Sequence, residues 1–249
     1  MAEPPFSKLH LAEKGDPDYV VQKMFESVIV MPMLMEWADK LDKKSYTTKS
    51  AALRGQRSAQ DLLRLASKVL DDLQGWYEEM KQEIPAPVPN NSVEEGSGSP
   101  PGEFQFASPM DKYVWTLYWV CALYANLLVK QLEARHKGLD RLLDHPLRFP
   151  VELREIGLSL EELDQYAKNI RASLFSGTRS SAFDAQETMA PAFALQWYYE
   201  QRGNTTQMLW CIDAIKRIEQ QGLALNVQVK ETPTWCPRVR ARFLAEVEG

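Results

Sequence analysis

A run without any charged side chain, residues 113–129, is the feature that most constrains how this chain folds. It reads YVWTLYWVCALYANLLV and must be removed from water as a whole. A membrane-spanning helix needs roughly 20 predominantly apolar residues. This run is shorter, contains Thr116 and Asn126, and continues into Lys130. We therefore expect a helix that extends to about His136, buried in the core of a helical protein and not spanning a membrane.

A second long helix is predicted over residues 48–83, because its apolar residues recur at intervals of three and four. Such spacing places them on one broad face of a helix. The positions concerned are Leu62, Ala66, Val69, Leu73, Trp76 and Met80. Charged residues mostly occupy the other face, and Pro85 is expected to end the helix.

Capping residues and prolines predict the remaining helices. Asp16 and Pro17 are a favourable helix start, and the helix is expected to reach about Lys43 with a kink or split at Pro32. Ser159 and Glu162 form a capping-box pattern ahead of a helix over residues 160–174.

Two more helices follow towards the C-terminus. One covers residues 184–201, with Pro191 inside it, and the next is capped by Asn204 and ends at Gly222. A short helix over residues 237–248 is also expected, whereas Val227–Val229 is too short to predict a strand.

The chain is therefore expected to be all-α: an irregular multi-helix array forming a single domain over residues 1–249. Residues 85–109 interrupt the helical pattern with proline, glycine, serine and asparagine, and such a composition predicts a flexible linker within that domain. The sequence shows neither an alternation of strands with helices nor an internal repeat, and either of these would have indicated a different fold class.

The charge and cysteine content restrict the function. With 29 basic and 34 acidic side chains the net charge is −5, which argues against autonomous nucleic-acid binding and against attraction to an anionic membrane. Three widely spaced cysteines do not form a disulfide framework and favour a reducing compartment. The N-terminus has no signal-peptide pattern, so we expect the nucleus or the cytoplasm.

No motif predicts catalysis, a metal site or a cofactor, and we expect no enzymatic activity. Glu133 and His136 have the E-x-x-H spacing of di-iron bundles, but the chain lacks a second such pair, and the simpler interpretation is an exposed helix end. Asp71 and Asp72 are expected on a solvated helix face. Cys121 and Cys211 are expected in the core. A basic cluster of Arg238, Arg240 and Arg242 is expected to solvate a terminal helix.

Aromatic residues are the one group that left two interpretations open. They could line an apolar ligand pocket between helices, or they could simply form the core, which is the more common role. The six candidates are Trp115, Tyr118, Trp119, Trp197, Tyr198 and Trp210.

Five short segments, taken in order, resemble a known family. They are residues 73–77 (LQGWY), 117–119 (LYW), 169–173 (NIRAS), 189–195 (MAPAFAL) and 208–212 (MLWCI). This order is similar to the C-terminal regulatory region of fungal binuclear zinc cluster transcription factors. The resemblance covers about residues 55–225. The six-cysteine DNA-binding module of that family has no counterpart here, since the first cysteine is Cys121.

The resemblance implies a helical module that regulates transcription through protein contacts, with the transcription machinery or a DNA-binding regulator as partner. A small-molecule effector and a role beside secondary-metabolite genes also follow from it. Direct sequence-specific DNA binding does not. The alternative function is an all-α enzyme or ligand carrier that uses an aromatic-lined pocket in a metabolite pathway.

Overall fold

The chain is all-α, as the sequence predicted. The computed structural model describes residues 17–44, 46–89, 104–149, 157–175 and 182–220. In these ranges the elements are α1 (Pro17–Val28), α2 (Met31–Lys43), α3 (Lys49–Glu83), β1 (Val88–Pro89), β2 (Phe104–Gln105), α4 (Pro109–Asp140), α5 (Leu160–Phe175), α6 (Ala182–Gln201) and α7 (Thr205–Gln220).

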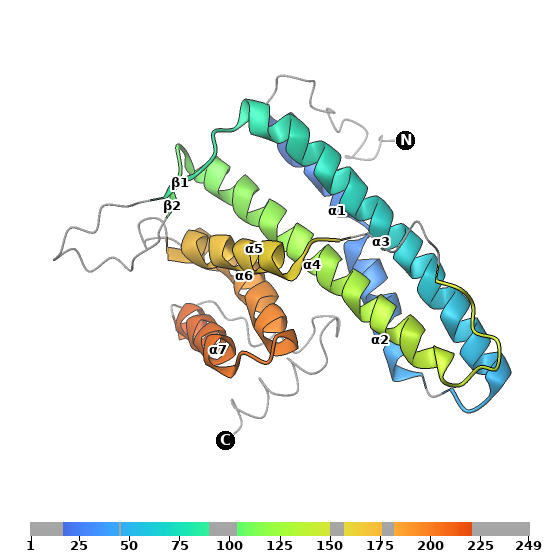
Figure 1. The fold of residues 1–249 in the computed structure, drawn as a ribbon. Helices are drawn as coiled ribbons and strands as arrows, with labels where there is room; N and C mark the ends of the chain where they lie inside the picture. The colour runs from blue at the N-terminus through green and yellow to red at the C-terminus, as the bar shows by residue number, and fades with distance from the viewer. Residues whose placement is uncertain (1–16, 45, 90–103, 150–156, 176–181, 221–249) are drawn as a thin grey trace, which may run out of the picture.

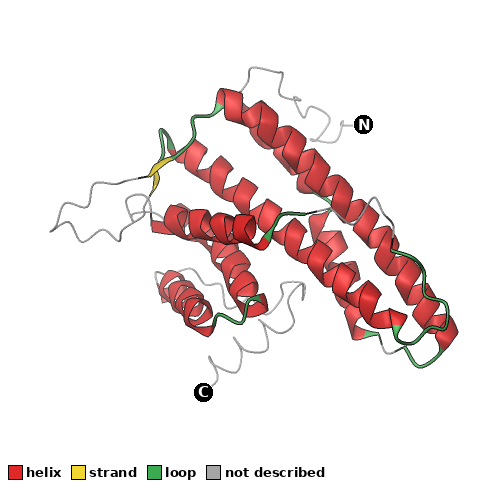
Figure 2. Cartoon of the chain, in the orientation of Figure 1, coloured by secondary structure: helices red, strands yellow, loops and turns green. Residues whose placement is uncertain are grey.

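Helix α4 is the central element of the fold. Figure 1 shows α3 running alongside it, with α1 and α2 next to this pair and α5, α6 and α7 gathered near the N-terminal half of α4. Helices α3 and α4 are antiparallel. This direction is shown by Tyr77, near the end of α3, which stacks on Tyr118 near the start of α4. Figure 2 shows that regular structure in the described residues is almost entirely helical.

The two long helices begin at side-chain caps. Thr48 Oγ1 accepts a hydrogen bond from the backbone N–H of Ala51 at 3.2 Å, and Ser108 Oγ accepts one from Asp111 at 3.1 Å. Each bond satisfies a donor that the first turn of a helix leaves without a partner. The predicted bounds of α3 are confirmed, and α4 extends the uncharged run in both directions.

The uncharged run of α4 is buried in the core, as expected. From Val114 to Val129 only Leu117 and Cys121 are more than slightly exposed. No helix among the described residues has the length and apolar character needed to cross a membrane. The core placement of α4 follows from its contacts with α3, α5 and α6.

Asn126 explains why the run contains a polar residue. Its Nδ2 donates to the carbonyl of Ala122 at 2.7 Å, and its Oδ1 accepts from the backbone N–H of Leu158 at 2.7 Å. The preceding residue, Gly157, has φ of 97°, and a Cβ there would lie 2.9 Å from Asn126 Oδ1. Asn126 therefore holds the start of α5 against α4, and glycine permits both the conformation and the close approach.

The split predicted at Pro32 is confirmed. Helix α1 ends at Val28 and α2 begins at Met31. Pro32 has no N–H to donate to the carbonyl four residues earlier, so the helical hydrogen bonding stops and then resumes when Leu34 N donates to Val30 O at 3.0 Å. The predicted start at Asp16 lies outside the described residues.

The caps predicted for α5 and α7 are also confirmed. Ser159 N donates to Glu162 Oε2 at 2.8 Å, and Glu162 N donates to Ser159 Oγ at 3.2 Å, which is the reciprocal capping box. Asn204 Oδ1 accepts from Gln207 N at 3.2 Å. Helix α6 passes through Pro191. The predicted stop at Gly222 and the segments 227–229 and 237–248 lie outside the described residues.

The two ends of the predicted linker over residues 85–109 are joined to each other and to α4. Val88 and Pro89 of β1 pair in antiparallel fashion with Gln105 and Phe104 of β2. The carbonyl of Pro85 accepts from Trp115 Nε1 at 3.0 Å. Residues 90–103 of the linker lie outside the described residues.

A close contact fixes the other end of the α3–α4 pair. A Cβ built on Gly55 would lie 2.6 Å from Tyr46 Cε1 and 3.0 Å from Leu139 Cδ1. Tyr46 also contacts Arg135, whose guanidinium lies 5.0 Å from the centre of its ring. Arg135 also donates to the carbonyls of Leu41 and Lys44 at 3.0 and 2.8 Å, so it satisfies the C-terminal end of α2.

The substitution Gly55→Ala is therefore expected to lower the free energy of unfolding by about 1–2 kcal/mol, because overpacking outweighs the better helix propensity of alanine. Gly75 in the same helix is the matched control, since a Cβ there meets nothing within 4 Å. Gly75→Ala should raise the free energy of unfolding by about 0.5–1 kcal/mol. Urea unfolding followed by circular dichroism measures both, and equal stabilisation by the two substitutions would contradict the contact.

Candidate interaction surface

Three of the six aromatic candidates form one buried group on α4. The Trp115 and Trp119 rings lie 5.6 Å apart, and the Tyr118 ring lies 5.5 Å from Trp76 of α3. Tyr118 also exchanges a hydrogen bond of 3.1 Å with the hydroxyl of Tyr166 on α5. Burial is the main cause that raises the pKa of Tyr118 far above its ordinary value. These rings fill the space where α3, α4 and α5 meet.

The other three aromatic candidates lie on α6 and α7. Trp197 packs against Tyr124 of α4 with ring centres 5.5 Å apart, and Tyr198 donates a hydrogen bond to Asp164 of α5. Trp210 is partly exposed, and the Arg171 guanidinium lies 4.9 Å from the centre of its ring. The six residues therefore contact different neighbours.

His136 is not on an exposed helix end, so that expectation was wrong. Its side chain is 1% exposed, and its Nε2 lies 3.0 Å from Gln60 Nε2 on α3. Its Nδ1 has no hydrogen-bond partner among the described residues and lies 4.0 Å from Asp140 Oδ1. Burial lowers the pKa of His136, the Asp140 charge opposing that effect, so the imidazole is neutral at neutral pH.

The buried glutamines beside His136 position the chain that follows α4. Gln60 Nε2 donates to the carbonyl of Arg148 at 3.0 Å, and Gln56 Oε1 accepts from Leu147 N at 2.9 Å. Gln56 Nε2 also donates to Asp140. The polar side chains of Gln56, Gln60 and His136 are thus used to fasten the residues after α4, which is a structural role.

The remaining chemical candidates occupy unremarkable positions. Burial raises the pKa of the Cys121 and Cys211 thiols to about 12 each, so both are protonated at neutral pH, and both contribute to the core as expected. Asp71 and Asp72 lie on an exposed face, also as expected. Within the described ranges, no cluster of three or more histidine, cysteine or acidic side chains could hold a metal ion. Arg238, Arg240 and Arg242 lie outside those ranges.

The most unusual surface is an exposed apolar stripe on α1, α2 and the two-residue connection between them. Its members are Phe25 (46% exposed), Ile29 (75%), Val30 (37%), Met33 (39%) and Trp37 (42%). Phe25 lies on α1, Met33 and Trp37 lie one turn apart on α2, and Ile29 and Val30 form the two-residue connection between the helices. The opposite side of the same segment, including Met24, Met31 and Leu34, is buried in the core.

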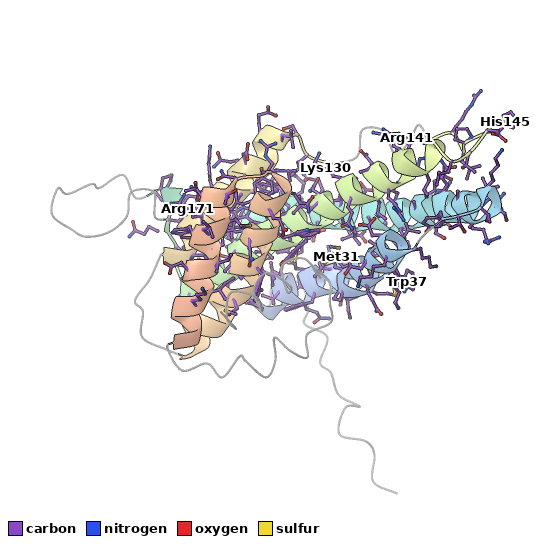
Figure 3. All side chains as sticks on the ribbon, turned by 90° about the horizontal axis from the view of Figure 1, so that it is seen from below. Met31, Trp37, Lys130, Arg141, His145 and Arg171 are labelled. Carbon is purple, nitrogen blue, oxygen red and sulfur yellow. The ribbon has the colours of Figure 1, made fainter. Side chains whose placement is uncertain are left out.

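Contiguous exposed apolar residues on a folded protein mark an interaction site more often than scattered ones do. Figure 3 shows Trp37 on α2 at the outer side of the molecule, away from α6 and α7. Charged residues border the stripe: Glu26 at its N-terminal end, and Glu36 and Lys40 at its C-terminal end, where they form an ion pair of 2.6 Å. An apolar centre with a charged rim is the usual composition of a protein-binding surface.

Asp39 lies next to this stripe on α2 and is electrostatically strained. Its Oδ2 is buried and has no hydrogen-bond partner in the described part of the chain. Burial, partly offset by Lys43 and reinforced by Asp42, raises the pKa of the Asp39 carboxyl to about 6. The ionised carboxylate at neutral pH therefore costs folding free energy.

Sequence reasoning missed the apolar stripe, although its signal was present. The segment has apolar residues at nearly every position from Met24 to Met35, which is more than a helix needs to cover one core face. The aromatic residues were the stronger signal in the sequence, and they lie largely in the core. Of the stripe, only Trp37 and Phe25 are aromatic, and they are separated by Pro32.

No family model matches the chain, and neither a curated protein nor a solved structure resembles it significantly.

Replacing Asp39 with asparagine should stabilise the protein in a pH-dependent way. Because the folded-state pKa is raised, the folded state binds more protons than the unfolded state between about pH 4 and 6, so stability falls as pH rises through that window. Asp39→Asn removes this loss. It is expected to raise the free energy of unfolding by about 1 kcal/mol at pH 7, after allowance for partial solvent screening, and to have no effect at pH 4.

Urea unfolding at the two pH values measures this difference. Asp71→Asn, at an exposed carboxyl on α3, is the control and should change stability equally little at both. A pH-independent effect of Asp39→Asn would show that the carboxyl is not desolvated.

Proposed function

We propose that this chain is a transcription-regulator-like helical module that acts through protein contacts. The observation that carries the proposal is the apolar stripe on α1, α2 and their connection, formed by Phe25, Ile29, Val30, Met33 and Trp37. Leaving such residues in water costs free energy that a protein partner would recover. The protein contact is proposed from the stripe, whereas transcription, a nuclear site of action and control of secondary-metabolite genes rest on the resemblance of residues 55–225.

The form of the stripe favours a protein partner over a small molecule. Its residues lie along the outer side of two consecutive helices, which presents an extended surface, whereas ligand sites are concave and enclose most of the ligand. Trp and Met are enriched in the cores of protein interfaces, and both occur here. A partner helix laid along such a stripe would bury its own apolar residues at the same spacing.

Tethering tests the function directly. The full chain, fused to a heterologous DNA-binding domain in a fungal host, is expected to change the output of a reporter gene at least fivefold. The double variant Met33→Ala/Trp37→Ala should return the reporter to within twofold of the DNA-binding domain alone, because it removes the centre of the stripe.

Two single variants at exposed apolar positions elsewhere serve as matched controls. Leu65→Ala on α3 and Leu209→Ala on α7 replace side chains that are 43% and 49% exposed, and they should keep the wild-type reporter output. Immunoblotting establishes equal amounts of every fusion. The proposal is wrong if the wild-type fusion leaves the reporter unchanged, or if the control variants lose as much activity as the stripe variant.

A further inference from the structure

We propose that the occupant of the apolar stripe is a second copy of this chain, packed in an antiparallel, two-fold symmetric manner with Met33 at the symmetry axis. This proposal deepens the proposed function, because it rests on the same stripe being a protein contact. It names the partner, the direction of packing and the register of the two helices.

The spacing of the stripe is what a helix–helix seam requires. Glu26, Met33 and Lys40 recur at intervals of seven, and Ile29, Val30 and Trp37 fill the positions between them. Apolar positions that alternate at three and four residues form a narrow seam that can interlock with the same seam on another helix. Val30, in the connection between α1 and α2, has backbone angles of φ −83° and ψ −12°, in the helical region, and its carbonyl accepts from Leu34 N at 3.0 Å.

The order of residues around Met33 makes the stripe complementary to itself. In a two-fold interface, if residue i of one copy contacts residue j of the other, then j also contacts i. With Met33 opposite Met33, the antiparallel register places Ile29 opposite Trp37. The most exposed aliphatic side chain of the segment would then cover its most exposed tryptophan, once on each side of the axis.

The charges at the two ends obey the same symmetry. Seven residues before Met33 stands Glu26 and seven residues after it stands Lys40, so this register places each glutamate opposite a lysine of the other copy. A parallel arrangement would instead bring glutamate to glutamate and lysine to lysine, and like charges in contact disfavour it. Lys40 is free to reorient towards the second copy, because its present bond to Glu36 joins two side chains that are each more than half exposed.

The length of the seam is consistent with a reversible dimer. Residues 26–40 comprise the end of α1, a two-residue connection and most of α2, and at the helical rise per residue they would span about 22 Å. A pair of faces of this length, with an apolar centre and a charged rim, corresponds to the smaller class of specific interfaces. We therefore expect a reversible dimer with a dissociation constant in the micromolar range, and no permanent oligomer.

A charge exchange tests partner and register together. Sedimentation equilibrium of the full chain should show a monomer–dimer equilibrium. Glu26→Lys and Lys40→Glu should each raise its dissociation constant at least tenfold, since every substitution affects two symmetry-related pairs. The double variant Glu26→Lys/Lys40→Glu restores opposite charges across the interface and should return to within threefold of wild type.

Two further measurements guard against an indirect effect. The exchange Asp61→Lys/Arg64→Glu reverses an exposed ion pair on α3 and should leave the equilibrium unchanged. Met33→Cys should form a disulfide-linked dimer under mild oxidation because residue 33 faces its own copy, whereas Leu65→Cys should form none above the wild-type level.

A monomer at every concentration would overturn the proposal. So would a dimer that ignores the charge exchange and fails to cross-link through residue 33, because it would then form through another face.

The outcomes also separate this inference from the proposed function. If the chain is monomeric but Met33→Ala/Trp37→Ala still abolishes reporter output, the stripe binds a different protein, and only the second-copy proposal fails. If the charge exchange restores dimerisation but the fusion never affects a reporter, the dimer is correct and the regulatory function is not.

Discussion

The antiparallel packing of α3 against α4 is the interaction on which the rest of the structure depends. Neither helix can exist alone in water, since α4 carries an uncharged run and α3 a broad apolar face. Aromatic residues join the pair near one end, where Tyr77 stacks on Tyr118, and buried polar residues join it near the other, where Gln60 meets His136. Helices α1, α2, α5 and α6 pack on this pair, and α7 packs on α6. Helix α1 is also joined to α3 by the Val20 carbonyl, which accepts from Trp76 Nε1 at 2.7 Å.

The sequence was sufficient to predict most of the fold because its signals are local. Thr48, Ser159 and Asn204 mark helix starts by chemistry confined to three residues, and Pro32 breaks a helix by the absence of its own N–H. Burial of the run in α4 followed from its lack of charge. The β1–β2 pairing was not predicted, because two-residue strands have no periodicity to detect and depend on a partner 15 or more residues away.

The candidate site could not be predicted in the same way. Whether an apolar side chain is buried depends on which face the neighbouring helices cover, and that is decided by tertiary packing. His136 was expected at an exposed end and proved buried, because α3 supplies Gln60 opposite it. Ile29 and Trp37 look like core residues in the sequence, yet the face that α1 and α2 turn to the core is the one with Met24 and Leu34. Helical periodicity shows that a segment has two apolar faces, but not which of them remains exposed.

The pairing of β1 with β2 makes the packing of the helices independent of the number of residues between the two strands. Because Pro89 is fixed next to Phe104, and Phe104 packs against Trp119, the residues between these two points begin and end at a constant place. Doubling the length of such a closed segment changes its closure free energy by only about 0.6 kcal/mol. Evolution, or an engineer inserting a reporter peptide between residues 90 and 103, could therefore vary this segment while α3 and α4 keep their registration.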